Sequence, residues 1–172
     1  MATVTESAFT GFSNPFALNP QVANAVPATT ALFNRLSVDQ KLAALWVIYT
    51  ELGKSITPAA TGAARLQFAE GLLNQIKQMP QNEQLQAMRD IANKVSNPVS
   101  RAYGVLTNNT KLAFWYQLAV WMEDGSVIPV PESYKLSREA NQLMASLRQL
   151  EMNQQITVLR NAVINMGVDP LA

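Results

Sequence analysis

The 172-residue sequence contains no cysteine and no histidine. Without cysteine there can be no disulfide, no thiolate nucleophile and no cysteine metal site. Without histidine the chain lacks the side chain most often used as a general base near neutral pH, and a Ser-His-Asp triad is impossible. The sequence also lacks the glycine-rich P-loop pattern and the GxGxxG pattern of dinucleotide-binding proteins. We therefore expect that the protein is not an enzyme and holds no metal ion.

Charged residues are also scarce. They make up 15% of the chain, against about a quarter in a typical globular protein. The 13 lysines and arginines and the 12 acidic residues leave a net charge of +1, and no basic run forms the patch that a nucleic acid would need. Nucleic acid is therefore not an expected partner. Glu123 and Asp124 lie beside Gly125 at a predicted helix end, where we expect solvated carboxylates rather than a catalytic pair.

Long hydrophobic runs are missing too. No segment reaches the ~18 uninterrupted apolar residues that a membrane-spanning helix needs. The first residues show neither the basic region nor the apolar core of a secretory signal. We therefore expect a soluble cytoplasmic protein without a membrane span.

What the sequence does contain is helical periodicity. Residues 1–24 show no sustained period and are predicted to form an N-terminal arm, and residues 25–172 are predicted to form one helical domain. Ser37 and Gln40 have the spacing of a capping box, and Pro129 with Pro131 requires an extended connector. The fold is predicted to be all-α with about eight helices: from Pro27, from Ser37 to Leu52, from Pro58 to Met79, after Pro80, from Pro98 to Val105, from caps at Asn108, Asn109 and Thr110 to Gly125, from Ser137, and a last one closed by Gly167.

Two of these helices carry stripes that mix large planar side chains with small ones. Such a stripe can leave a slot for a flat apolar ligand, or its side chains can interlock and form an ordinary core. Spacing alone does not decide between the two. The stripes consist of Leu42, Leu45, Trp46, Tyr49 and Gly53, and of Leu112, Trp115, Tyr116, Ala119 and Met122.

Five separated segments resemble, in the same order, the N-terminal domain of the orange carotenoid protein of cyanobacteria. The similarity extends from about Val26 to Asp169. The resemblance implies an all-α domain of two interleaved four-helix bundles around a keto-carotenoid such as canthaxanthin or echinenone. The full-length family continues into a C-terminal α/β domain, so a chain ending at Ala172 is expected to be a stand-alone helical carotenoid protein. The segments are Leu45–Lys54, Gln67–Glu70, Lys111–Leu118, Ile128–Ser137 and Gln154–Asn161.

The resemblance also implies roles for individual residues. Asn109 and Arg160 match positions that contact a second domain or a light-harvesting antenna in the family. Eleven other positions match the pigment-lining set, and the two stripes supply most of them. The implied carotenoid-binding residues are Leu42, Leu45, Trp46, Tyr49, Met88, Leu112, Trp115, Tyr116, Met122, Val130 and Tyr134.

The expected function is therefore that of a carotenoid-binding photoprotective protein that quenches singlet oxygen or excited antenna pigments without bond chemistry. Two alternatives stay open. One is an interaction module that docks on the phycobilisome, on a separate C-terminal-domain homologue or on another copy of itself. The other is a carrier that delivers carotenoid to other proteins. In the first case the protein would associate with the thylakoid antenna.

Overall fold

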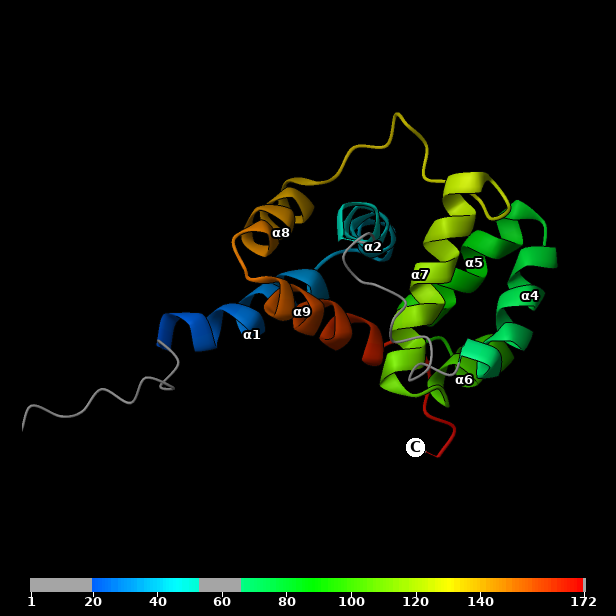
Figure 1. Ribbon diagram of the computed structural model, residues 1–172. Coiled ribbons are helices and arrows are strands. Elements are labelled where there is room, and N and C mark those ends of the chain that lie inside the picture. Colours follow the sequence, from blue (N-terminus) through cyan, green and yellow to red (C-terminus); the bar gives the residue numbers. More distant parts are fainter. Residues whose placement is uncertain (1–19, 53–65, 172) are drawn as a thin grey trace, which may run out of the picture.

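The computed structural model describes residues 20–52 and 66–171 (Figure 1). Within these residues the chain forms eight α-helices and one 3-10 turn, and no strand. The all-α class is confirmed. The elements are α1 (Pro20–Asn34), α2 (Val38–Leu52), η2 (Leu66–Phe68), α4 (Glu70–Gln78), α5 (Gln81–Ala92), α6 (Pro98–Gly104), α7 (Asn108–Asp124), α8 (Arg138–Arg148) and α9 (Met152–Ile164).

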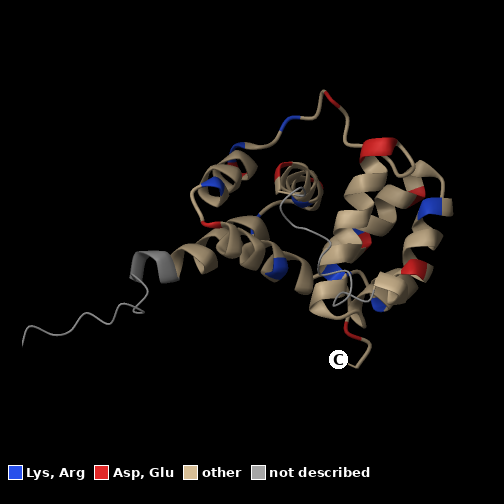
Figure 2. Ribbon diagram, in the orientation of Figure 1, with Lys and Arg blue, Asp and Glu red and all other residues tan. Residues whose placement is uncertain are grey.

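The helices form two interleaved bundles, as predicted. α1 packs on α8 and α9, and α2 packs on α8, so the first and last helices of the described chain make one bundle. The central helices α4 to α7 make the other (Figure 1). α2 contacts α5 and α7, and α7 contacts α9, which joins the two bundles along a seam. Charged residues are scattered thinly over both bundles (Figure 2).

Several helix boundaries follow from local chemistry. Ser137 has an extended backbone and its hydroxyl accepts a hydrogen bond from the amide of Ala140, which caps α8. Gly125 ends α7 with a φ of 83°, a left-handed conformation that glycine adopts without strain. The cap of α7 is Thr107, one residue before the three predicted caps, because its hydroxyl accepts the Thr110 amide.

Three local predictions are wrong. Pro27 lies inside α1 rather than at its start, at an exposed position of the helix. Gln40 does not cap its own helix, because its side chain bonds Tyr134 and Ser137. The helix predicted from Pro58 to Met79 is not continuous in its described part, where the Ala69 amide bonds the Leu66 carbonyl in a 3-10 turn and α4 begins only at Glu70.

The predicted arm, residues 1–24, lies mostly outside the described residues. Where the chain is described, α1 already begins at Pro20. The C-terminal end returns to the second bundle, where the amide of Gly167 donates to the carbonyl of Ile91 and that of Val168 to Ser100. These bonds hold the chain after α9 against α5 and α6.

Candidate functional site

The two aromatic stripes meet at the seam between the bundles. The hydroxyl of Tyr49 donates a hydrogen bond of 2.8 Å to the backbone carbonyl of Leu112. The rings of Tyr49 and Tyr116 lie edge to face, with centroids 6.2 Å apart. At the other end of the stripes, Leu42 and Met122 line one cavity. α2 and α7 therefore run antiparallel here, and the stripes face each other over about ten residues, or roughly 15 Å of helix.

The cavity at the Leu42 end has a volume of about 490 Å³. This volume falls within the range of small-molecule sites, which span roughly 300–1,000 Å³. Its wall is mainly apolar and includes five residues of the predicted pigment-lining set. The lining consists of the predicted Leu42, Met88, Met122, Val130 and Tyr134, together with Asp39, Ala43, Gln81, Leu85, Arg89, Ile128, Pro129 and Pro131.

The other six predicted residues lie along the seam and outside this cavity. Trp46 and Tyr116 are only half-buried, whereas the rest are buried side chains of the common core. The side chains of the two stripes therefore interlock at the Tyr49 end and leave a cavity at the Leu42 end. The six are Leu45, Trp46, Tyr49, Leu112, Trp115 and Tyr116.

Trp115 is fixed by a residue that sequence reasoning missed. Its indole Nε1 donates to the Tyr103 hydroxyl at 3.0 Å, and that hydroxyl donates to the Val163 carbonyl at 2.6 Å. The Tyr103, Phe114 and Trp115 rings contact one another edge to face. This relay connects α6, α7 and α9. The only signal for it in the sequence is one tyrosine in a short helix.

The polar atoms of the buried tyrosines are thus all used within the fold. Burial raises the pKa of Tyr49 and of Tyr103, so both phenols stay protonated at neutral pH. Neither group can act as a base or present a charge to a ligand. The two buried phenols therefore add no charge to the seam.

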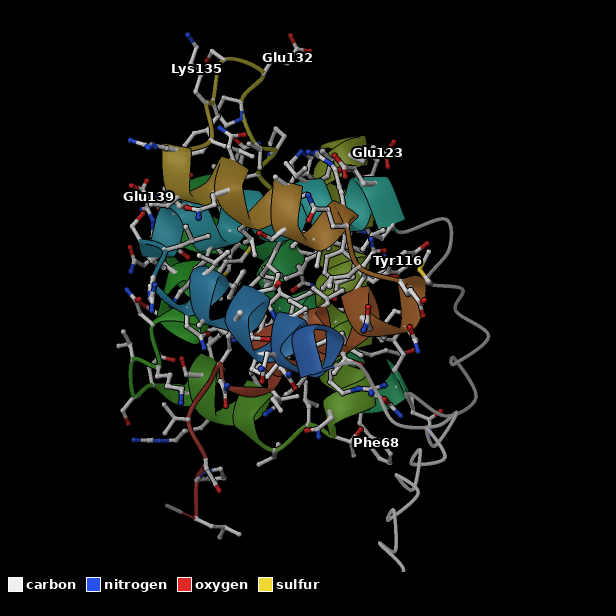
Figure 3. The ribbon with its side chains drawn as sticks, turned by 90° about the vertical axis from the view of Figure 1, so that its left-hand side faces the viewer. Phe68, Tyr116, Glu123, Glu132, Lys135 and Glu139 are labelled. Carbon is white, nitrogen blue, oxygen red and sulfur yellow. The ribbon has the colours of Figure 1, made fainter. Side chains whose placement is uncertain are left out.

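The connector between α7 and α8 forms the outer wall of the cavity and is held at both ends by buried or half-buried glutamines. The Gln84 amide donates to the carbonyls of Lys77 and Ser126 and accepts from the amide of Ile128. Gln40 donates to the Tyr134 hydroxyl and accepts from the Ser137 amide. On the same connector, Glu132 and Lys135 point away from the helices (Figure 3).

One corner of the cavity is polar. Arg89 donates to both carboxylate oxygens of Asp39, at 2.7 and 3.0 Å. This hydrogen bonding lowers the pKa of Asp39 and raises that of Arg89, so both remain charged at neutral pH. The side chains are 33% and 45% exposed, so the pair adds about 1 kcal/mol or less to stability.

The two predicted interface residues lie together on the surface. Arg160, on α9, donates from Nη2 to the Asn109 side-chain oxygen at 3.4 Å, which is near the limit for a hydrogen bond. Asn109 is exposed at the start of α7. The seam between α7 and α9 brings them together across 51 positions of sequence.

No cluster of metal-binding side chains occurs in residues 20–52 and 66–171. Within the same ranges, no helix is both long enough and apolar enough to cross a bilayer. Glu123 and Asp124 are exposed, as expected, and the Asp124 carboxylate accepts the Ser126 amide at 2.8 Å.

Comparison with known proteins identifies the family. The family model for the orange carotenoid protein N-terminal domain matches residues 19–169. The chain belongs to the orange carotenoid protein N-terminal domain family. An orange carotenoid-binding domain-containing protein of Nostoc sp. strain PCC 7120 is 58% identical over 172 residues, which cover 100% of this chain and 99% of that protein.

Relatives with a longer chain match this family domain over about half of their length. The orange carotenoid-binding protein of Limnospira maxima is 49% identical over 147 residues, covering 86% of this chain and 46% of that protein. The solved orange carotenoid protein of Anabaena (Nostoc) sp. PCC 7120, which binds canthaxanthin, superposes with a TM-score of 0.80 at 51% identity, covering 86% of this chain and 48% of that one.

A solved red carotenoid protein matches the family domain over nearly its whole length. This protein, also from Anabaena (Nostoc) sp. PCC 7120 and binding canthaxanthin, superposes with a TM-score of 0.72 at 40% identity. The match covers 83% of this chain and 97% of that structure. The two-bundle fold is therefore that of the carotenoid-binding N-terminal domain.

Proposed function

We propose that this protein binds a carotenoid at the seam between its bundles and acts in photoprotection. The observation that carries the proposal is the mainly apolar cavity of about 490 Å³, which lies at the Leu42 and Met122 end of the paired aromatic stripes. The solved relatives that bind canthaxanthin share this fold and support the same assignment.

The shape of the site suits a long, thin, apolar ligand. A 40-carbon polyene is about 30 Å long, the length of a helix of about 20 residues. The cavity borders Asp39, Leu42 and Ala43 but stops before Trp46 and Tyr49. It therefore holds one end of the pigment, and the polyene follows the stripes, where half-buried Trp46 and Tyr116 make room by moving aside.

The protein residues exclude water and orient the pigment. Leu42, Met88 and Met122 give a dry apolar wall, and methionine adapts its shape to a ligand at little cost. The pigment supplies the photophysics when bound, accepting excitation energy and releasing it as heat. The chain makes no bonds in this process.

A cavity-filling substitution tests the proposal. Ala43 is buried and lines the cavity, so Ala43→Phe places a ring where the pigment end should lie. The matched control is Ala28→Phe, in a separate hollow between α1 and α8. Each protein is expressed with a canthaxanthin source, and bound pigment is measured by visible absorption.

We expect Ala43→Phe to lose most bound pigment and Ala28→Phe to keep it. The pigmented protein should also shorten the lifetime of singlet oxygen in solution relative to the pigment-free protein. Equal pigment in both variants would place the ligand elsewhere. Pigment without singlet-oxygen quenching would favour the carrier function.

The pair of Asn109 and Arg160 favours a second candidate function, docking on a partner. Their contact presents a guanidinium and an amide on one exposed face. Such a face suits an antenna subunit, a separate C-terminal-domain homologue or another copy of the chain. Arg160→Glu should abolish co-elution with the partner and leave bound pigment unchanged, because Arg160 lies outside the cavity; retained co-elution would exclude this face.

A further inference from the structure

A second hollow lies where the two bundles meet, beside the last residues of α1, α5 and α9. Its volume is about 300 Å³, and it shares no lining residue with the cavity behind the connector. Its apolar floor is buried, whereas its polar lining includes two lysines and three asparagines but no carboxylate. This lysine hollow is lined by Phe33, Ala92, Ala162 and Met166, and by Lys41, Lys94, Asn34, Asn93 and Asn165.

The positive charges of the two lysines are not balanced by acidic side chains. Lys41, on α2, is half-buried, and Lys94 follows the end of α5. No ion pair of the described residues includes either of them. Burial lowers the pKa of Lys41, and the nearby charge of Lys94 lowers it further. An anion bound between the two ammonium groups would relieve both effects.

Lys94 holds its place at the hollow with a strained backbone. Its amide donates to the carbonyl of Ile91. The Val95 amide donates to the carbonyl of Asp90, and the two bonds together form the motif that commonly ends a helix at a left-handed glycine. Lys94 has a φ of 56° and is the one non-glycine residue with a positive φ in the described chain. A lysine inside the last turn of α5 would offset the helix end without this strain, but would not place a second ammonium group here.

The hollow favours an anion even when the helix ends are counted. Each helix C-terminus carries about half a negative charge, and three helices end here. Lys111 donates to the last carbonyl of α9 at 3.3 Å, so it already offsets that end. Lys41 and Lys94 then carry two positive charges against about one negative charge from α1 and α5. The side-chain amides of Asn34 and Asn93 bond no other described residue and add N–H donors.

We propose that Lys41 and Lys94 bind a doubly charged oxyanion, such as inorganic phosphate, in the lysine hollow, and that the bound ion links the two bundles. Lys41 belongs to α2 in one bundle, and Lys94 follows α5 in the other. An ion that contacts both lysines adds a polar link between the bundles and stabilises the folded chain. The inference is independent of the proposed function, because the hollow and the cavity have no residue in common.

Thermal unfolding of the complete 172-residue protein tests the inference. The Tm is measured by circular dichroism without multivalent anions, with about 10 mM sodium phosphate, and with sodium chloride at the same ionic strength. Two charge-assisted hydrogen bonds support a Kd on the order of 1 mM. Phosphate at about 10 mM should then raise the Tm by about 3–6 °C. Chloride should raise it by less than about 1 °C, and at this concentration the general stabilising effect of phosphate as an excluded salt is small.

Two variants and one control locate the ion. Lys94→Gly should raise the Tm of the anion-free protein by about 2–4 °C, because glycine adopts the left-handed conformation without strain. Its affinity for phosphate should nevertheless fall about tenfold, so that the phosphate-induced rise drops to about 1 °C. Lys41→Met should show the same drop. Lys135→Met is the matched control and should keep the full rise, because it also removes one positive charge, and Lys135 points away from the helices (Figure 3).

Each alternative result would overturn the inference. Equal Tm rises in phosphate and in chloride would indicate general screening of the lysines. No rise in the wild-type protein, a full rise in either hollow variant, or a reduced rise in Lys135→Met would place the ion elsewhere or exclude it. If Lys41→Met fails to fold, Lys94→Gly decides, since glycine suits the backbone at that position. Pigment binding is measured separately, so a failure here leaves the proposed function in place.

Discussion

The Tyr103 relay gives the sharpest test of how the aromatic seam is held. Tyr103 is fully buried, and its hydroxyl links the indole of Trp115 on α7 to the carbonyl of Val163 on α9. Tyr103→Phe keeps the ring and removes only this oxygen. The Trp115 Nε1 then has no partner, whereas the Val163 carbonyl still accepts the Met166 amide at 3.3 Å.

The expected cost can be estimated from these contacts. An unsatisfied buried donor costs about 1–3 kcal/mol, and the lost bond to Val163 adds about 1 kcal/mol. We therefore expect Tyr103→Phe to lower the free energy of unfolding by about 3 kcal/mol. For a chain of this size, that loss corresponds to a fall in Tm of roughly 6–12 °C.

Two other tyrosines serve as comparisons in urea and thermal unfolding followed by circular dichroism. Tyr49→Phe should cost only about 1 kcal/mol, because the Leu112 carbonyl lies inside α7 and keeps its helical bond. Tyr116→Phe should change stability by less than about 0.5 kcal/mol, since no described residue bonds its hydroxyl. Equal losses in Tyr103→Phe and Tyr49→Phe would refute the argument that the unpaired indole dominates.

The helices could be predicted from the sequence because their boundaries depend on near neighbours. Pro80 prevents α4 from continuing, Gly125 adopts a positive φ, and Ser137 bonds an amide three residues away. The sequence could also predict that the residues of each stripe lie on one side of their helix, since helical spacing puts Tyr49 and Leu42 on one side of α2. The residue set along the seam came from the family resemblance, and its contact with pigment stays a prediction.

The long-range hydrogen bonds could not be predicted in this way. Gln40 was expected to cap its own helix, yet it bonds an amide 97 positions away, because the connector offers an otherwise unsatisfied donor. Arg89 meets Asp39 across 50 positions, and Tyr103 meets Val163 across 60. Periodicity reports which face of a helix is apolar, but not which distant polar group needs a partner.

The sequence also could not predict whether the two stripes form a slot for a ligand or an ordinary packed core. The answer depends on the connector, because its residues Val130 and Pro131 line a cavity together with residues of α2 and α5 at that end. At the other end, Tyr49 reaches the α7 backbone directly and closes the space. Two helices with similar stripes therefore produce both outcomes along one seam.

Three further predictions concern stability and use urea unfolding of the pigment-free protein. The buried Ser100 hydroxyl has no hydrogen-bond partner among the described residues, so Ser100→Ala should raise stability by about 1 kcal/mol, and a loss would show that the hydroxyl is satisfied. A Cβ at Gly104 would lie 2.0 Å from the Val168 carbonyl oxygen, so Gly104→Ala should cost about 1–3 kcal/mol, whereas Gly71→Ala, on α4 with open space around it, should gain up to about 1 kcal/mol. The last prediction concerns alkaline pH. Burial raises the pKa of Tyr49 and Tyr103 in the folded state above the value of about 10 that holds in the unfolded chain. Their contribution to stability is therefore complete below pH ~10 and is lost above it, because the unfolded chain releases protons that the folded protein retains. The urea midpoint should fall between about pH 9.5 and 11, and the fall should be shallower in a variant that combines Tyr49→Phe with Tyr103→Phe. An equally steep fall in that variant would assign the alkaline transition to other groups.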